Sequence, residues 1–122
     1  MTKEKASRRK PFDLEERTAQ FGAAILRFAK TLPINAITSS LVVQLVKAGT
    51  SVGANYGEAN EAGSKKAFKH IISICRRESK ECQHWLRMIA VAVPSARDRA
   101  KTLWSEAKEL HLIFNAIFRN TE

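Results

Sequence analysis

Two residues on one predicted helix, Glu81 and His84, have the Glu-x-x-His spacing with which di-iron helix bundles bind metal. Such a centre needs a second Glu-x-x-His pair and two further inward-facing glutamates, because side chains from four helices share the metals. The chain has no second pair: Ala67 stands three residues before His70, and His111 follows an acid by only two residues. We therefore expect neither a metal site nor another cofactor.

The two cysteines, Cys75 and Cys82, lie seven residues apart on the same predicted helix. Two helical turns separate them by roughly 10 Å, too far for a disulfide. They share an apolar seam with Phe68 and Trp85, so we expect small core residues in a reducing cytoplasm, and no secretory signal precedes them. The sequence has no activated serine motif, no phosphate-cradling glycine loop and no cysteine with an evident partner base, so we expect no enzyme.

Positive charge is the strongest functional pattern in the chain. The 122 residues include 21 Lys+Arg against 12 Asp+Glu, a net charge of +9. On the helix predicted after Gly63, cations and polar donors recur by threes and fours, about 200° around the helix from the apolar seam. This basic stripe comprises Lys66, Lys69, Ser73, Arg76, Lys80, Gln83 and Arg87, broadened by Lys65 and Arg77. The spacing predicts one outward-facing surface of cations.

The first eleven residues form a separate basic segment that includes Arg8, Arg9 and Lys10 and has little to anchor it, so we expect a flexible arm before a single domain over residues 12–122. Cations without interleaved exposed aromatics suit phosphate contacts rather than base reading. We therefore expect binding of RNA or DNA without strong sequence specificity. The alternative is a non-enzymatic scaffold whose oligomer binds an acidic protein partner.

Four amphipathic helices with short connections are predicted to present these residues. They begin at Asp13, near Asn35, after Ser64 as N-cap, and after a capping box of Ser95 and Asp98, and the first ends near Leu32. Helices of about twenty residues joined by short loops favour an antiparallel, up-down-up-down four-helix bundle, an all-α fold.

The second predicted helix carries glycines at four-residue intervals, Gly49, Gly53 and Gly57. A face without side chains lets another helix backbone approach closely, so we expect these glycines and Tyr56 to form a helix-packing contact or an interface between copies of the chain. The alternative is that the helix breaks at about residue 49. This helix is the only transmembrane candidate, and Lys47 near its middle argues against a membrane.

Two carboxylates, Glu58 and Glu78, stand on or beside faces that should be buried. An isolated buried charge is too costly, so each needs a partner, for which Asn55, Tyr56, Lys47 or an arginine are available. We expect Asn55, Glu58 and Glu78 to be buried polar residues that fix helix register or a subunit interface. A functional role for the carboxylates stays open.

The run Ser51-Val-Gly-Ala-Asn-Tyr-Gly-Glu-Ala59 resembles the small four-helix bundle proteins encoded in intervening sequences of bacterial 23S ribosomal RNA genes. The resemblance covers most of residues 12 to 92, and its further matches are Phe12-Asp13-Leu14, Leu32-Pro33, Ser64, Lys65, Phe68, His70, Glu78, Glu81, Trp85 and Leu86. It implies a homopentamer, similar in architecture to the basic accessory protein of diversity-generating retroelements, which binds nucleic acid and reverse transcriptase. It implies no established enzymatic activity. Ala67 departs from the pattern, because relatives tend to carry an acid there.

Overall fold

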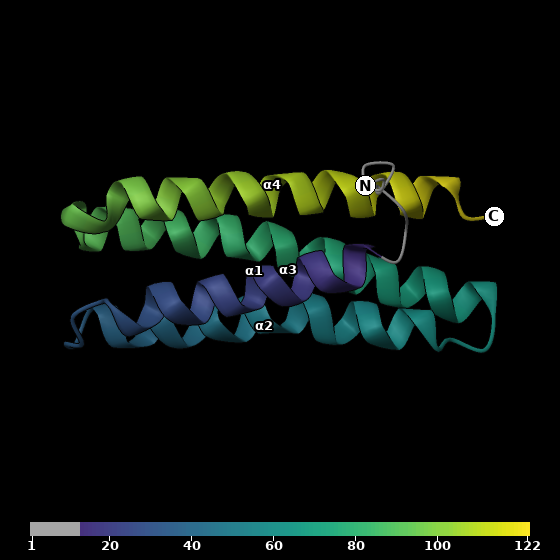
Figure 1. The fold of residues 1–122 in the computed structure, drawn as a ribbon, viewed down its shortest axis with the longest axis horizontal. Helices are drawn as coiled ribbons and strands as arrows, with labels where there is room; N and C mark the ends of the chain where they lie inside the picture. The colour runs from purple at the N-terminus through teal and green to yellow at the C-terminus, as the bar shows by residue number, and fades with distance from the viewer. Residues whose placement is uncertain (1–12) are drawn as a thin grey trace, which may run out of the picture.

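The computed structural model describes residues 13–122, which form four α-helices and no strand. The helices are α1 (Asp13–Lys30), α2 (Thr38–Asn60), α3 (Lys65–Ala92) and α4 (Arg97–Asn120), with a short 3₁₀ turn at Pro94–Ala96 before α4. Successive helices run in opposite directions along the long axis (Figure 1). The predicted all-α, up-down-up-down arrangement is confirmed for the single chain. No helix of the described residues is long and apolar enough to span a membrane.

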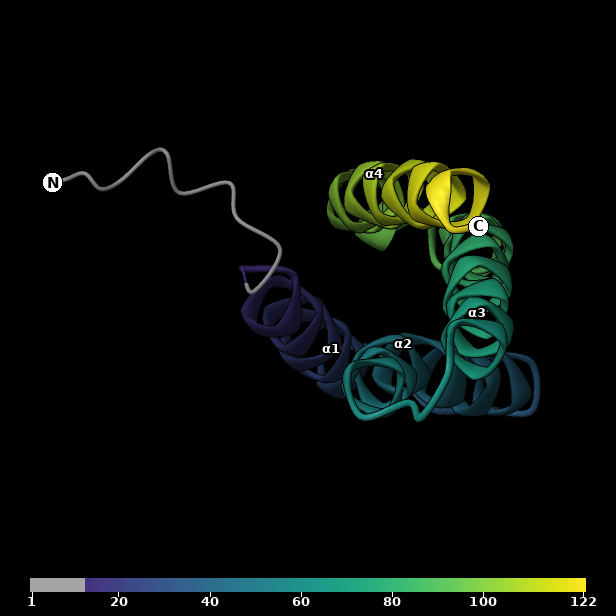
Figure 2. The same ribbon diagram turned by 90° about the vertical axis from the view of Figure 1, so that its right-hand side faces the viewer.

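Helices that are neighbours in sequence are also neighbours in space. Viewed along the bundle, α1 lies beside α2, α2 beside α3 and α3 beside α4 (Figure 2). The contact between α1 and α4, which closes the bundle, is much smaller than these three. Consequently α2 and α3 are the central helices, each with a neighbour on two sides.

Two of the helix starts show the local chemistry that their sequence suggests. Asn35 precedes α2, and its Oδ1 accepts hydrogen bonds from the backbone N–H groups of Ile37 and Thr38. The Ser64 side chain caps α3 by accepting from the Ala67 N–H at 3.1 Å. The capping box predicted at Ser95 is wrong. Ser95 lies inside the 3₁₀ turn, which leads directly into α4, and the start of α4 has no side-chain cap.

The core side of α3 differs from the predicted seam by one residue over much of its length. Cys75 and Cys82 are buried as expected, but Trp85 and Glu78 are only partly buried, and Ile72, Ser79 and Leu86 are fully buried instead. Because α3 packs against α2 on one side and α4 on the other, its buried surface is wider than a single seam and its centre is shifted. The Ser79 hydroxyl is satisfied within the helix, donating to the Cys75 carbonyl at 2.9 Å.

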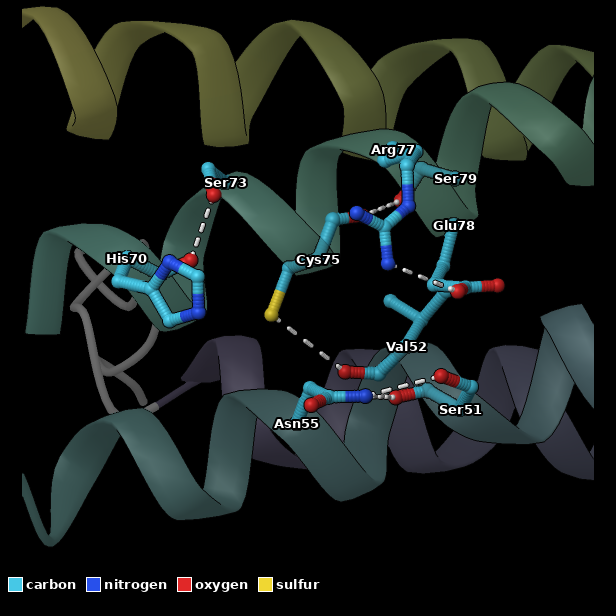
Figure 3. A network of polar contacts seen from close by, with 9 residues as sticks. All are labelled: Ser51, Val52, Asn55, His70, Ser73, Cys75, Arg77, Glu78 and Ser79. Carbon is cyan, nitrogen blue, oxygen red and sulfur yellow. Dashed lines mark hydrogen bonds and ion pairs between the residues drawn. The ribbon is translucent and has the colours of Figure 1, made fainter. Parts of the chain in front are cut away.

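Both cysteines are free thiols in this core, as expected from their spacing. Burial raises the pKa of Cys75 and of Cys82 to about 12. Cys75 Sγ lies 3.8 Å from the Val52 carbonyl oxygen on α2 (Figure 3). Thiols that stay protonated and buried at neutral pH are weak nucleophiles and poor metal ligands.

The glycines of α2 do not break the helix, which runs on to Asn60. Gly49 and Gly53 instead permit a close approach to α1 of the same chain. A Cβ atom at Gly49 would lie 2.9 Å from two side-chain carbons of Ile25, and one at Gly53 would lie 3.3 Å from Thr18 Oγ1. A Cβ at Gly57 would meet nothing within 4 Å. The predicted helix-packing contact therefore involves two of the three glycines.

Tyr56 lies in the core of the chain, only 5% exposed. Its ring is tilted against that of Phe114 on α4, with 6.0 Å between centroids, so it links two helices that are not sequence neighbours. Burial is the main cause of the raised pKa of its hydroxyl. Tyr56 is thus a core aromatic residue and is not available to a second copy of the chain.

Charged groups close the small contact between α1 and α4. Arg17 on α1 donates to both carboxylate oxygens of Glu106, at 2.7 and 2.9 Å, and lies 3.6 Å from Glu109. The hydrogen bond to Glu106 is the main cause of a raised Arg17 pKa. At the other end of α1, Arg99 from α4 donates to Thr31 Oγ1 at 2.7 Å.

Candidate nucleic-acid interface

The predicted basic stripe on α3 is not a single outward face. Lys65, Lys66, Lys80 and Arg87 are exposed, but Gln83 is buried, with 6% of its surface exposed. The reason is the central position of α3, whose second neighbour, α4, covers part of the face opposite α2 (Figure 2). A surface helix with one neighbour would have left this stripe in solvent.

Two cations of the stripe, Lys69 and Arg76, are half-buried against α4. Lys69 Nζ lies 4.6 Å and the Arg76 guanidinium carbon 4.1 Å from the centroid of the Phe118 ring. The Arg76 guanidinium also approaches Asn115 Oδ1 at 3.4 Å. Stacking on an aromatic face stabilises a cation by about 0.5–2 kcal/mol. These two cations therefore hold α3 and α4 together and are partly withdrawn from solvent.

Arg77 and Glu78 form an ion pair at the surface of α3, with 3.7 Å between nitrogen and oxygen (Figure 3). The Glu78 side chain is 19% exposed and has an arginine as its partner, so the predicted buried and partnered carboxylate is confirmed in part, whereas the fully buried core position beside it is Ser79. Partial burial and the nearby Glu81 raise the Glu78 pKa, and Arg77 opposes this. Arg77 is thus partly neutralised as a candidate phosphate contact.

The remaining predicted polar residues lie on α2. Glu58 is exposed, which contradicts its predicted burial, since it stands beside the core positions Tyr56 and Ala59 without facing inward. Asn55 is half-buried and its amide donates within its own helix, to the Ser51 carbonyl and hydroxyl, each at 2.9 Å (Figure 3). The hydrogen bonds of Asn55 thus stay within α2, and Glu58 takes part in none of the ion pairs of the described residues.

Six basic residues gather at the end of the bundle where α1 ends and α3 turns into α4 (Figure 1). All six side chains are exposed: Arg27, Lys30, Arg87, Arg97, Arg99 and Lys101. We call this set the bundle-end cluster. Among the described residues none of the six forms an ion pair, and the only acid in these segments is Asp98. The antiparallel topology brings together residues that lie more than seventy positions apart in sequence.

Of the bundle-end cluster, the sequence pattern had identified only Arg87. A signal was present at the start of α4, where Arg97, Arg99 and Lys101 fall within the first five helical residues. The helix dipole disfavours cations there, typically by a few tenths of a kcal/mol to about 1 kcal/mol each. Contacts with Thr31 and the Phe28 ring offset this cost for Arg99, whereas Arg97 and Lys101 make no described contact that would do so. The predicted contacts Arg8, Arg9 and Lys10 lie outside the described residues.

Two hollows flank the start of α4. One, of about 340 Å³, lies between α3 and α4 and is lined by Leu86, Arg87, Ala90, Arg97, Ala100, Lys101 and Trp104. The other, of about 370 Å³, lies between α1 and α4 and is lined by Arg27, Phe28, Thr31, Arg99, Thr102 and Leu103. Five of the six cluster cations border one hollow or the other, so the positive charge surrounds concave surface.

Metal-binding chemistry has little support among residues 13–122. No group of three or more His, Cys, Asp or Glu side chains lies close enough there to hold a metal ion. Glu81 and His84 are both exposed, and the His84 ring stands edge-on to Trp85 with 4.8 Å between centroids. A polar hollow of about 210 Å³ between α2 and α3 is lined by Gln44, Lys47, Ala48, Ser51, Glu78 and Glu81.

Comparison with known proteins identifies relatives of this chain. The model of the 23S rRNA-intervening sequence protein family matches residues 11–116. A crystal structure of a Bacteroides thetaiotaomicron protein of unknown function, from the S23 ribosomal protein family, superposes with a TM-score of 0.76 and 22% identity. The match covers 87% of this chain and 98% of that one. No curated protein matches significantly.

Proposed function

The chain belongs to the 23S rRNA-intervening sequence protein family, and we propose that it is a non-enzymatic protein that binds RNA or DNA through phosphate contacts, without strong sequence specificity. The bundle-end cluster carries this proposal. It places six exposed cations beside a single acid, whereas the ion pairs of the described residues lie elsewhere on the bundle. Unpaired cations attract phosphates and release the counterions that surround them.

The geometry of the cluster suits a phosphate backbone. Its members come from α1, α3 and α4, so the cations spread around one end of the bundle instead of lining one helix. Arginine and lysine in this arrangement neutralise several phosphates without reading base edges. Lys80, exposed on α3 before Arg87, extends the surface.

We further propose that the protein acts as an oligomer, with a homopentameric ring as the form that the family resemblance implies. Exposed apolar residues on the α1–α2 side support self-association. Leu26 is 42% exposed and Val43 54%, and Ile34 and Ile37 between these helices are 68% and 69% exposed. Since Gly49, Gly53 and Tyr56 are used inside the chain, this surface replaces them as the candidate interface. A ring would repeat the bundle-end cluster and strengthen binding through multivalency.

Fluorescence anisotropy with labelled 20-nucleotide RNA and DNA tests the proposal. The variant Arg87→Gln/Arg97→Gln/Lys101→Gln removes three cations of the cluster. We expect a loss of affinity of about tenfold or more at low salt and a slope of log affinity against log salt that is flatter by about two to three units. The matched control is Lys65→Gln/Lys66→Gln/Arg119→Gln, which removes the same charge from exposed positions at the opposite end. Absence of binding at low salt, or equal effects of the two variants, contradicts the proposal.

The alternative is a scaffold that binds an acidic protein. Val91, 75% exposed between Arg87 and Arg97, favours it, because an apolar residue among cations suits an acidic surface with an apolar centre. The two functions separate on purification. Nucleic-acid binding predicts co-purified material that absorbs at 260 nm and leaves in high salt, whereas the scaffold predicts clean protein and one specific protein in a pull-down.

A further inference from the structure

The hollow between α3 and α4 differs from an ordinary phosphate-binding surface because its floor is apolar. Leu86 and Ala100 are buried, Ala90 and Trp104 are half-buried, and together they form the floor. Arg87, Arg97 and Lys101 are exposed at its rim. We call this hollow the Trp104 groove. An anion alone gains nothing from an apolar floor, so the groove suits a ligand with a flat apolar part and negative charge beside it.

We propose that the Trp104 groove binds one unpaired nucleotide of a single-stranded segment, with the base against Trp104 and the flanking phosphates on Arg87, Arg97 and Lys101. This inference rests on the nucleic-acid binding proposed above and adds a preference for single strands. Bases in a duplex are stacked on both faces, whereas an unpaired base offers its face to an aromatic side chain.

The size of the groove favours a nucleotide over a partner helix. Its volume of about 340 Å³ lies near the lower end of small-molecule sites. On α3 the apolar floor spans only Leu86 and Ala90, one helical turn, or about 6 Å. An amphipathic helix of an acidic protein presents apolar residues over at least two turns, roughly 10 Å or more. The groove is therefore too short to cover such a helix.

Trp104 provides the aromatic surface. It is partly buried, and Lys108 Nζ lies 5.6 Å from its ring centroid, which adds a fourth cation beside the groove. The second hollow, between α1 and α4, lacks this feature. Its aromatic residue, Phe28, is only 5% exposed, so its ring offers little surface to a ligand. Only the Trp104 groove combines an accessible aromatic ring with a cationic rim among the described hollows.

The test compares a 12-nucleotide single strand with a 12-base-pair duplex, each as RNA and as DNA, for the wild-type chain and for Trp104→Leu. Leucine keeps an apolar side chain but removes the aromatic face. We expect single-strand affinity to fall about tenfold, with duplex affinity and the salt slope unchanged. Trp104→Phe retains a smaller ring, so its affinity for the single strand should lie between those of the wild-type chain and Trp104→Leu. Equal results for RNA and DNA mean that the site reads the base and phosphate, and a difference means that the sugar contributes.

A second measurement does not depend on the Trp104→Leu variant being folded. In Trp85→Phe, the remaining indole is Trp104, and its fluorescence should be quenched by the single strand but not by the duplex. Unchanged fluorescence, or a Trp104→Leu variant that binds single strands as tightly as wild type, overturns the inference. Displacement of the single strand by a 12-residue poly-glutamate peptide at equal concentration also overturns it. If no nucleic acid binds even at low salt, the proposed function fails first, so the two failures are distinguishable.

Discussion

Helix α1 is held by its two neighbours in different ways. Against α2 the contact depends on missing side chains, since a Cβ at Gly49 would lie 2.9 Å from Ile25. Against α4 it depends on long charged side chains, with Arg17 donating twice to Glu106. The first contact is steric and tolerates no additional atom. The second is electrostatic, and its long side chains can adjust to small changes in distance. Shape and charge therefore fix the orientation of α1 by separate physical means.

Gly49→Ala should give the largest effect. The added methyl group would meet Ile25, a fully buried branched side chain with no room to move, and overpacking of this kind costs up to about 3 kcal/mol. Alanine recovers about 1 kcal/mol of helix propensity. We therefore expect the free energy of unfolding to fall by about 2 kcal/mol, measured by urea denaturation.

Gly57→Ala is the matched control for the steric contact. A Cβ at Gly57 meets nothing within 4 Å, so the same exchange on the same helix should raise the free energy of unfolding by up to about 1 kcal/mol. Opposite signs at the two glycines would establish that close packing and not glycine flexibility matters at Gly49. The same sign at both positions would refute the steric half of the comparison.

Arg17→Ala tests the electrostatic contact. Its side chain is 33% exposed, and the bidentate pairing with Glu106 is close to ideal, so we expect a loss of about 1 kcal/mol at low salt. The loss should shrink in 1 M NaCl, because salt screens exposed charges. Glu109→Gln, which alters the longer 3.6 Å contact, is the control and should have little effect. A salt-independent loss would mean that Arg17 acts through its apolar stem.

Glu78→Gln should have the smallest effect on the free energy of unfolding, and it should raise this free energy where Arg17→Ala lowers it. Burial raises the Glu78 pKa, so the folded state binds this proton more readily than the unfolded chain does, and the charged form costs stability at neutral pH. Stability from this group therefore increases as pH falls through its folded pKa. We expect Glu78→Gln to raise the free energy of unfolding at pH 7 by on the order of a few tenths of a kcal/mol. The gain is small because the variant also loses the ion pair with Arg77. At pH 4 wild type and variant should converge, as thermal melts can show.

The fold was largely predictable because the local patterns are strong. Pro33, Gly63 and Pro94 separate four amphipathic segments, and Ser64 acts as the N-cap that its position indicates. What failed was the angular position of side chains on α3. A helix between two neighbours has a wide buried surface, so its apolar residues do not define one seam, and Ser79 is fully buried where Glu78 is only partly buried.

The candidate site was harder to predict for a related reason. Periodicity along one helix found Lys69 and Arg76, but it could not reveal that Phe118 from α4 lies against them. Nor could it bring Arg27 and Arg97 to one end of the bundle, since that depends on the alternation of all four helices. Residues from different helices become one surface only after the topology is known.

The order in which helices pack also bears on how the chain folds. α2, α3 and α4 each contact the helix next to them in sequence, across connections of four residues, so little loop-closure entropy opposes their assembly. The Arg17 contact with Glu106 joins residues 89 positions apart, and it gains nothing until the intervening hairpins are in place. Closure of α1 onto α4 is therefore suited to be a late step in folding. By the same reasoning it is an early step of local opening, and amides along α1 should exchange with solvent before those of α3.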